Sequence, residues 1–426
     1  MEVPELEKSM GMEVYATSTE GIGGRIRVRT GDFVVREILE DGLRAGLEIA
    51  QGGQPSGRGS FLLCVLAKEG LDTFEAVRRL VRALGVPEGT VDFLGLKDAK
   101  ALTYQFITVR GVRPEVLRGL ELKGLRVIPV AFRTEPLSPD QLRANEFSII
   151  VRGLELSEPE LKERLKSILG ELKELGGLPN FFGHQRFGTA RPITHLVGRE
   201  LVKGDVKKAV EVLLTHIGPG EGPRAREARS YLADTWDFKG FLKLLPKNLY
   251  YERLIAGYLL RKPGNYHRAL RKIPLRLRRL FVQAYQAYLF NRFLSRRLSE
   301  DLPLSPIKGD FTLRLGDRTV LALPLPGFKQ ALSSGRQGEI EIEILEEEGV
   351  CLEDFKVKVM PELASPGGLR LALAPLDLVK VPEVLDDELN PGLRALKLLF
   401  RLIKGSYATV FLRELMKPLD PLKAGF

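Results

Sequence analysis

A long helical stretch separates two parts of this chain that otherwise show the patterns of short strands and turns. Residues 193–216 and about 224–300 repeat apolar side chains at the three- and four-residue spacing of helices. Residues 305–385 are predicted as short strands between proline and glycine turns, including the alternating sequence EIEIEILEEE at 339–348. This order predicts a helical module inserted into a domain of mixed helices and strands.

The first third of the chain is predicted to alternate between short strands and helices. The sequence GRIRVRTGDFVVREI (24–38) alternates on both sides of a Thr-Gly-Asp turn, which predicts two strands joined by that turn. The runs VDFLGL (91–96) and TYQFITV (103–109) predict two further strands, with Asp98 in the short connection between them. Enzymes often place reactive groups on such connections, because rigid strands hold them in position. By itself, an aspartate there is more often a turn residue than a catalyst.

The composition limits the classes of partner and cofactor. The chain has 65 Lys+Arg against 55 Asp+Glu and a net charge of +10, which favours a polyanionic partner. Because no run of about 18 apolar residues occurs, no membrane helix is expected. The two cysteines, Cys64 and Cys351, show no metal-ligand spacing with the four histidines, so no metal site is predicted. The low cysteine content and the polar N-terminus predict a cytoplasmic protein.

Residues 261–297 combine positive charge with aromatic side chains. This stretch contains 11 Lys or Arg and no acidic residue. A solvated helix face usually carries both signs, so the basic cluster is predicted to contact RNA. The predicted contacts are Arg271, Lys272, Arg276, Arg278 and Arg279. The aromatic residues recur at helical spacing and are predicted to be core residues rather than base-stacking platforms; they are Phe281, Tyr285, Tyr288 and Phe293.

Several separated segments resemble the TruD family of tRNA pseudouridine synthases. GLKDAKALTYQ (95–105) is similar to the family pattern G-x-K-D-x-x-A-x-T-x-Q. NFFGHQRFG (180–188) matches the family's Asn-aromatic-Phe-Gly-x-Gln-Arg-Phe-Gly signature, and IRVRTGDFVVRE (26–37) resembles its N-terminal I-K-x-x-P-E-D-F-x-V-x-E. QAYLFNRFLSRR (286–297) and GSYATVFLRELM (405–416) are also similar to family segments. These matches extend over almost the whole chain.

The resemblance implies an α+β fold. It consists of a pseudouridine synthase domain around a mixed, mainly antiparallel central sheet, together with an inserted, helix-rich TRUD domain. The boundaries predicted here are residues 1–200 for the first part of the catalytic domain, 201–375 for the inserted basic domain and 376–426 for the C-terminal part of the catalytic domain. The helical stretch found from periodicity falls where the family carries its insertion.

The resemblance also implies an activity, the isomerisation of a tRNA uridine, by default at position 13, to pseudouridine. The reaction breaks the bond from uracil N1 to the ribose and rejoins the base through C5. It needs no redox change and no group donor, so no cofactor is expected. The expected partner is tRNA, and the protein is expected to act as a monomer without a membrane or an obligatory protein partner.

Single residues take roles from the same resemblance. Asp98 is the implied catalytic carboxylate, which either attacks ribose C1′ or removes a proton from C2′. Arg27 is the cation expected to keep this carboxylate ionised in a dry pocket. Thr30-Gly31 stands where the family has Pro-Glu, a departure that affects the rigidity of the turn after Arg27.

The remaining assignments concern the base and the RNA backbone. Phe182 is expected to stack on the target base, and Asn180 to hydrogen-bond near the catalytic carboxylate. Phe33 is a further candidate for the pocket. Lys97 and Arg186 are expected to contact RNA.

Two other functions compete with this reading. A catalytically silent RNA-binding or RNA-chaperone protein of the same fold would keep the basic surface, and the intact motif around Asp98 argues against it. A glycoside or nucleoside hydrolase would need a second acid near Asp98, and no such pair is visible from the spacing.

Overall fold

A large central sheet organises the structure, a computed structural model that describes residues 2–51, 55–95, 97 and 99–426 of the chain. Its strands are β1 (Phe33–Leu39), β2 (Ser56–Gly57), β3 (Phe61–Glu69), β4 (Val91–Phe93), β5 (Leu102–Arg110), β6 (Leu125–Arg133), β7 (Leu142–Leu154), β13 (Leu376–Leu378), β14 (Glu383–Asp386) and β15 (Arg394–Ile403). Their order is β13-β15-β7-β1-β5-β3-β6-β2, with β14 beside β15 and β4 beside β5.

Most neighbouring strands in this sheet are antiparallel. Only the β1–β5 and β2–β6 pairs are parallel among the strands described. The predicted α+β fold with a mixed, mainly antiparallel sheet is therefore confirmed. The chain leaves the sheet after β7 and returns to it at β13, so β15 pairs with β7 across more than half of the sequence.

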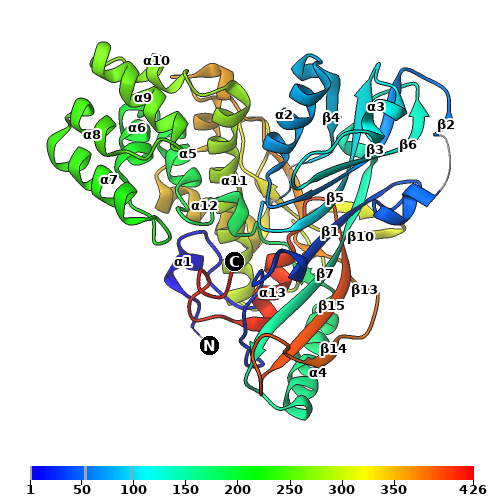
Figure 1. Cartoon of the computed structure of the whole chain (residues 1–426). Coiled ribbons are helices and arrows are strands. Elements are labelled where there is room, and N and C mark those ends of the chain that lie inside the picture. Colours follow the sequence, from blue (N-terminus) through cyan, green and yellow to red (C-terminus); the bar gives the residue numbers. More distant parts are fainter. Residues whose placement is uncertain (1, 52–54, 96, 98) are drawn as a thin grey trace.

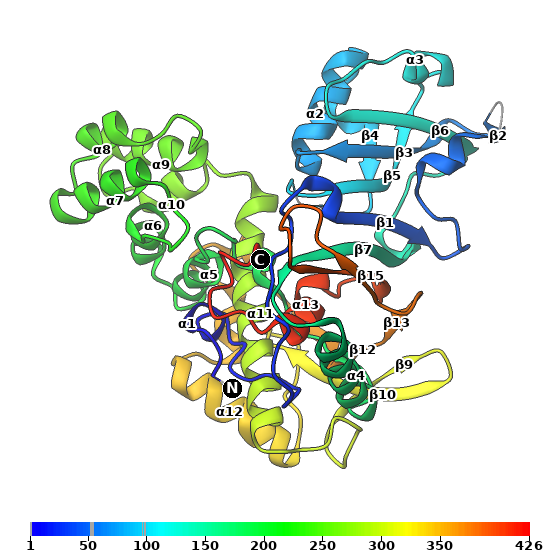
Figure 2. The ribbon, with the colours of Figure 1, turned by 60° about the horizontal axis from the view of Figure 1, so that its bottom comes forward.

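The predicted helical stretch forms a separate lobe beside the sheet (Figure 1). Its helices are α5 (Thr194–Val202), α6 (Val206–Thr215), α7 (Pro223–Thr235), α8 (Phe238–Leu244), α9 (Tyr250–Arg261), α10 (Tyr266–Leu270) and α11 (Leu275–Ser299). The long helix α11 runs from this lobe past the sheet (Figure 2). Tyr285 and Phe293 on α11 are fully buried, and Phe281 and Tyr288 pack against the same core, which confirms their prediction as core residues.

The prediction of a strand at 339–348 is wrong, because this segment forms helix α12 (Gly335–Glu348). Ile340, Ile344 and Leu345 are buried, whereas Ile342 is 47% exposed. The isoleucines alternate in sequence, but only those on one helical face reach the core. Glutamate is a good helix former, and Gly349 in the left-handed conformation ends the helix.

The predicted hairpin at 24–38 is wrong in its first half. Arg25 forms only an isolated bridge with Arg152, and a 3-10 turn (Thr30–Asp32) precedes β1. Arg27 has a φ of 58°, in the left-handed region, which interrupts any strand at that position. The chain therefore enters β1 from a bend, and this bend sets the direction of the Arg27 side chain.

The remaining elements cover the sheet and connect the lobes. A second sheet has the order β11-β10-β9, and a short pair joins β12 to β8. Their bounds are β8 (Leu178–Pro179), β9 (Phe311–Leu315), β10 (Arg318–Leu325), β11 (Gly368–Leu371) and β12 (Leu373–Ala374). The other helices are α1 (Glu5–Lys8), α2 (Thr73–Leu84), α3 (Pro114–Arg118), α4 (Glu158–Glu174) and α13 (Ala408–Met416). In the described part of the chain, no helix has the length and apolar character needed to cross a membrane.

Candidate active site

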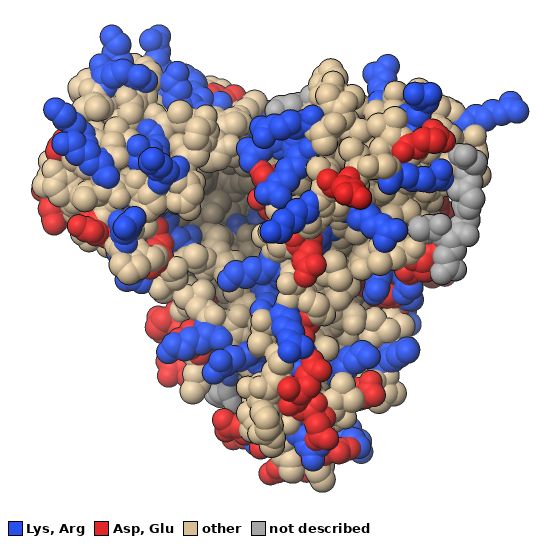
Figure 3. Space-filling view, viewed as in Figure 1, with Lys and Arg blue, Asp and Glu red and all other residues tan. Residues whose placement is uncertain are grey.

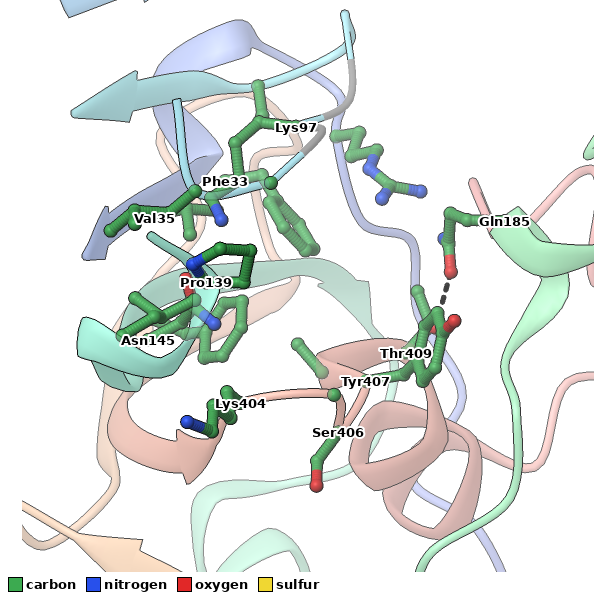
Figure 4. A pocket seen from close by; sticks show the side chains of 18 residues that line it. Phe33, Val35, Lys97, Pro139, Asn145, Gln185, Lys404, Ser406, Tyr407 and Thr409 are labelled. Carbon is green, nitrogen blue, oxygen red and sulfur yellow. Dashed lines mark hydrogen bonds between the residues drawn. The ribbon is translucent and has the colours of Figure 1, made fainter. Parts of the chain in front are cut away.

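A cavity of about 450 Å³ lies where several of the sequence motifs meet. This volume is within the usual range of small-molecule pockets. Arg27 and Phe33 come from the N-terminal motif (26–37), Gly95 and Lys97 from the motif at 95–105, and Tyr407 from the C-terminal segment 405–416. Figure 4 shows Phe33, Lys97 and Tyr407 around the cavity. The other lining residues are Val35, Leu94, Ala101, Pro139, Leu142, Asn145, Phe147, Gln185, Lys404, Gly405, Ser406, Ala408 and Thr409.

Aromatic rings form one wall of the cavity. The Phe33 and Phe147 rings pack edge to face with 6.5 Å between centroids, and Phe147 stacks on Phe400 at 5.3 Å. The Arg27 guanidinium lies 4.4 Å from the centre of the Phe33 ring, and its Nη1 donates to the Gly425 carbonyl at 2.9 Å. The wall thus combines a flat apolar surface with a fixed cation, which suits a planar ligand that carries polar groups.

Lys97 is tied into the protein through both its side chain and its backbone. Its Nζ lies 2.7 Å from Oε1 of the buried Glu37, whose other oxygen accepts a hydrogen bond from the Phe106 N–H at 2.8 Å. The Lys97 N–H donates to Thr73 Oγ1 at 2.9 Å. The Lys97 ammonium, predicted to meet RNA, therefore lies in the cavity wall in contact with Glu37. The prediction for Asp98 falls outside the described residues.

Asn180 and Phe182 form the layer behind the cavity wall. Neither lines the cavity, but Asn180 Oδ1 accepts a hydrogen bond from Ser406 Oγ at 3.1 Å. The Phe182 ring lies 6.1 Å from the Tyr407 ring and packs edge to face on Phe290 at 5.6 Å. The β8–β12 pair places Asn180 directly after a strand. The hydrogen bond from Ser406 joins it to residues 405–407, called here the 405–407 turn, which lie between β15 and α13.

Arg186 lies near this layer. Its guanidinium is 5.7 Å from the centre of the Phe182 ring, and its Nη2 lies 3.4 Å from Gln283 Oε1. The contact with Phe182 joins Arg186 to this layer, and its side chain remains partly exposed.

Sequence reasoning missed several of the residues that line the cavity. Gln185 and Thr409 are joined by a hydrogen bond of 2.9 Å, and both lie in segments that resemble the family (Figure 4). Tyr407 lies with Thr409 in the C-terminal segment 405–416. The resemblance of the segments 180–188 and 405–416 to the family could therefore have identified all three residues. Asn145 and Lys404 lie in no motif, and only the pairing of β7 with β15 brings them to the cavity.

The basic cluster at the start of α11 divides into buried and exposed residues. Arg278, which was predicted to contact RNA, is buried: it is 7% exposed, and its guanidinium binds Glu362 at 2.7 Å and the Ile273 carbonyl at 2.9 Å. Arg271 also binds Glu362, at 2.8 Å, and the two guanidiniums lower the pKa of this carboxyl to about 2. A charge pattern along one helix cannot reveal an acid more than eighty residues away.

The other basic residues of the cluster are exposed. Lys272 Nζ lies 5.1 Å from the centre of the Tyr258 ring, and Arg279 Nε donates to the Glu362 carbonyl at 3.2 Å. Arg276 lies over the rings of Phe74 and Phe93 at 5.4 and 5.5 Å, and so joins α11 to α2 and β4. The surface is hollowed between the helix lobe and the sheet, with Lys and Arg side chains on both sides of the hollow (Figure 3).

No metal centre is evident among these residues. In the described ranges, no group of three or more His, Cys, Asp or Glu side chains is arranged to hold an ion.

Comparisons with known proteins agree with the family resemblance. The chain matches the family model described as tRNA pseudouridine synthase D (TruD) over residues 9–319 and 315–415. A probable tRNA pseudouridine synthase D from Methanopyrus kandleri is 44% identical, over 85% of this chain and 87% of that protein. One from Methanosarcina mazei is 36% identical, over 99% of this chain and 100% of that protein.

A solved structure supports the fold independently of sequence motifs. The crystal structure of the putative tRNA pseudouridine synthase D (TruD) from Methanosarcina mazei matches with a TM-score of 0.79 at 35% identity. The match covers 99% of this chain and 100% of that one.

Proposed function

Because the chain belongs to the TruD family of tRNA pseudouridine synthases, we propose that it isomerises the uridine at position 13 of tRNA, with Asp98 as the catalytic carboxylate. The observation that carries this proposal is the convergence of the motifs on one cavity. Arg27, Phe33, Gly95, Lys97 and Tyr407 lie far apart in sequence and line the same space. Gly95 and Lys97 belong to the segment that contains Asp98.

The cavity suits a uracil ring that has left the base stack. Phe33 and Tyr407 line the cavity from different parts of the chain and offer aromatic faces. Stacking on such a face would keep the detached uracil in the cavity. Extruding the nucleotide costs a few kcal/mol, which favours a uridine that is already loosely paired. Asn180 and Phe182 support this wall through Ser406 and Tyr407.

The charge of the site suits an ionised carboxylate. A carboxylate in a dry pocket becomes protonated unless a cation or hydrogen bonds favour its charged form. Arg27 is fixed at the cavity by its contacts with Phe33 and Gly425. In this proposal Arg27 keeps Asp98 charged, so that it can attack ribose C1′ or take a proton from C2′.

The proposal extends to the partner and the domain organisation. The tRNA would lie in the hollow between the lobes and meet Lys272, Arg276 and Arg279 along the basic cluster. Residues 1–200 and 376–426 would form the catalytic domain around 201–375; the pairing of β15 with β7 supports this division. A monomeric, cytoplasmic enzyme that needs no cofactor completes the proposal.

The deciding experiment measures tritium release from a tRNA transcript labelled at uridine C5. The wild type is expected to release one equivalent of tritium per tRNA. A tRNA that lacks uridine 13 should give no release. Asp98→Asn is expected to lower the rate by roughly 10⁴-fold or more. Asp92→Asn, in the neighbouring β4, is the matched control and should remain active.

Two results would contradict the proposal. A wild type that binds tRNA but releases no tritium would favour the silent RNA-binding alternative. Equal release by the wild type and Asp98→Asn would remove Asp98 from the mechanism.

A further inference from the structure

One arginine outside all the motifs, Arg370, contacts the layer behind the cavity. It lies on β11, where it pairs with Leu323 of β10 in the second sheet. This sheet is part of the interval 201–375 that separates the two catalytic portions of the chain. The Arg370 guanidinium lies 4.0 Å from the centre of the Phe182 ring and 5.5 Å from that of Phe290.

The same guanidinium hydrogen-bonds to two segments of the site. Its Nε donates to the Asn180 carbonyl at 3.0 Å, and its Nη2 to Asn180 Oδ1 at 2.7 Å. The Nη2 group also donates to the carbonyl of Gly405 at 2.9 Å. Because Ser406 Oγ donates to the same Asn180 oxygen, Arg370, Asn180 and the 405–407 turn form one closed set of hydrogen bonds.

This set fixes the orientation of the Asn180 amide. Oδ1 accepts two hydrogen bonds, and Nδ2 donates to the Leu371 carbonyl at 3.0 Å. The turn is constrained as well, since Gly405 has a φ of +83° and its carbonyl is held by Arg370. Tyr407, which lines the cavity, follows two residues later.

The contacts of Arg370 make it an orienting group more than a stabilising one. Among the described residues, no carboxylate forms an ion pair with it, and burial lowers its pKa to about 10, so that it is charged at neutral pH. A partly buried cation without an acidic partner gains little stability for the fold. Its hydrogen bonds and ring contacts, in contrast, fix three separate groups in one geometry.

We propose that Arg370 is a positioning residue of the isomerisation, which fixes Asn180 behind the cavity wall and thereby holds the Tyr407 turn against the uridine. The inference rests on the proposed function. A detached base has to turn without leaving the cavity, so the wall must stay in place during the step. Displacing a positioned wall by about 1 Å can lower a rate by roughly 100-fold. The intervening sheet thereby contributes to catalysis without lining the cavity.

The test compares Arg370→Met with Arg314→Met, an exposed arginine on β9 of the same small sheet. Steady-state tritium release gives kcat and KM for tRNA at a temperature where both variants are folded by circular dichroism. Arg370→Met is expected to lower kcat by roughly 10- to 100-fold and to change KM by less than about 3-fold, because Arg370 orients protein groups rather than RNA. Arg314→Met should match the wild type. An unchanged kcat, or a rise in KM alone, would overturn the proposal.

Arg370→Lys separates geometry from charge. Lysine keeps a cation near Phe182 but cannot donate in the fixed fork of a guanidinium. Its kcat is therefore expected to stay low, and full activity would contradict the proposal. This variant decides the question if Arg370→Met does not fold. In a double-mutant cycle with Asn180→Ala, the effects on kcat should be clearly less than multiplicative.

A crystal structure of Arg370→Met tests the geometric claim without turnover. A rotated Asn180 amide and a displaced 405–407 turn are expected, and an unmoved turn would overturn the inference. An inactive wild type would contradict the proposed function and leave this structural test decisive for Arg370. An active wild type with an equally active Arg370→Met would contradict only the role of Arg370.

Discussion

The ion pair between Lys97 and Glu37 anchors the segment that precedes Asp98. Glu37 is fully buried, and its partner Lys97 is largely buried. Replacing Lys97 with methionine leaves the carboxylate of Glu37 without its cation, and breaking a buried pair in this way costs roughly 3–5 kcal/mol. Lys97→Met is therefore expected to lower the urea midpoint of unfolding markedly. The measurement is equilibrium unfolding followed by circular dichroism.

Lys100→Met provides the matched control for this prediction. Lys100 lies in the same connection but is exposed, so its replacement should change stability by less than about 0.5 kcal/mol. Equal midpoints for the two variants would show that the buried pair contributes nothing to stability.

Single residues show what local sequence could and could not predict. The motif at 26–37 indicated that Arg27 and Phe33 belong to the pocket, and both line the cavity. A short motif can indicate this because its residues are neighbours in sequence. Arg370 could not be found this way, since its partner Asn180 lies 190 positions away. Arg278 was predicted to contact RNA because its partner Glu362 lies 84 positions further along the chain and could not be recognised from the local sequence. Charge patterns report local composition, whereas burial and pairing depend on distant segments.

Helix α12 shows the same limit at the scale of an element. Alternating isoleucines indicated a strand, but a strand would have buried Ile342 together with Ile340 and Ile344, and Ile342 is exposed. The helix instead buries Glu341, whose carboxylate accepts hydrogen bonds from Ser333 N at 2.7 Å and Ser333 Oγ at 2.9 Å. An acidic residue on the buried face is what made a binary pattern misleading here.

Glu341 makes the stability of this element depend on pH. Burial raises its pKa to about 7 from an ordinary value of 4.5. Between about pH 4.5 and 7, the folded state therefore holds a proton that the unfolded state has lost. The contribution of this group to the free energy of unfolding is fully present below about pH 4.5 and is lost as the pH rises through about 7. Glu341→Gln is expected to remove this pH dependence and to raise the free energy of unfolding at pH 7.5 by up to roughly 3 kcal/mol. Thermal unfolding between pH 4.5 and 7.5 measures it.

Glu346→Gln, at an exposed position of the same helix, is the control and should keep the wild-type pH profile. A Glu341→Gln profile parallel to that of the wild type would mean that Glu341 does not titrate in this range.

At the scale of the whole molecule, periodicity predicted the helical insertion. It could not predict which distant strands pair, and that pairing forms the cavity. Helical spacing over 224–300 corresponds to α7–α11, because buried apolar side chains recur along these helices, although the middle of α11 is buried on all sides. The pairing of β15 with β7, which brings Lys404 and Asn145 to one cavity, connects residues far apart in sequence. No local pattern contains that information, since strands of similar composition can pair in many orders. The family motifs were informative because they mark segments that already meet in the folded protein.

The hollow between the two lobes gives the last prediction, which concerns tRNA binding as a function of salt. Each phosphate contact contributes about one unit to the slope of log Kd against log salt concentration. Lys272 is exposed between α10 and α11 of the helix lobe, so Lys272→Met is expected to weaken binding and to reduce the slope by about one. Arg278→Met removes the same charge from a buried position and should leave the slope unchanged while lowering the thermal midpoint. The two variants carry the same net charge, so any difference in slope reports location alone. Filter binding from 50 to 300 mM salt distinguishes them, and equal slopes for both variants would place the tRNA elsewhere on the surface.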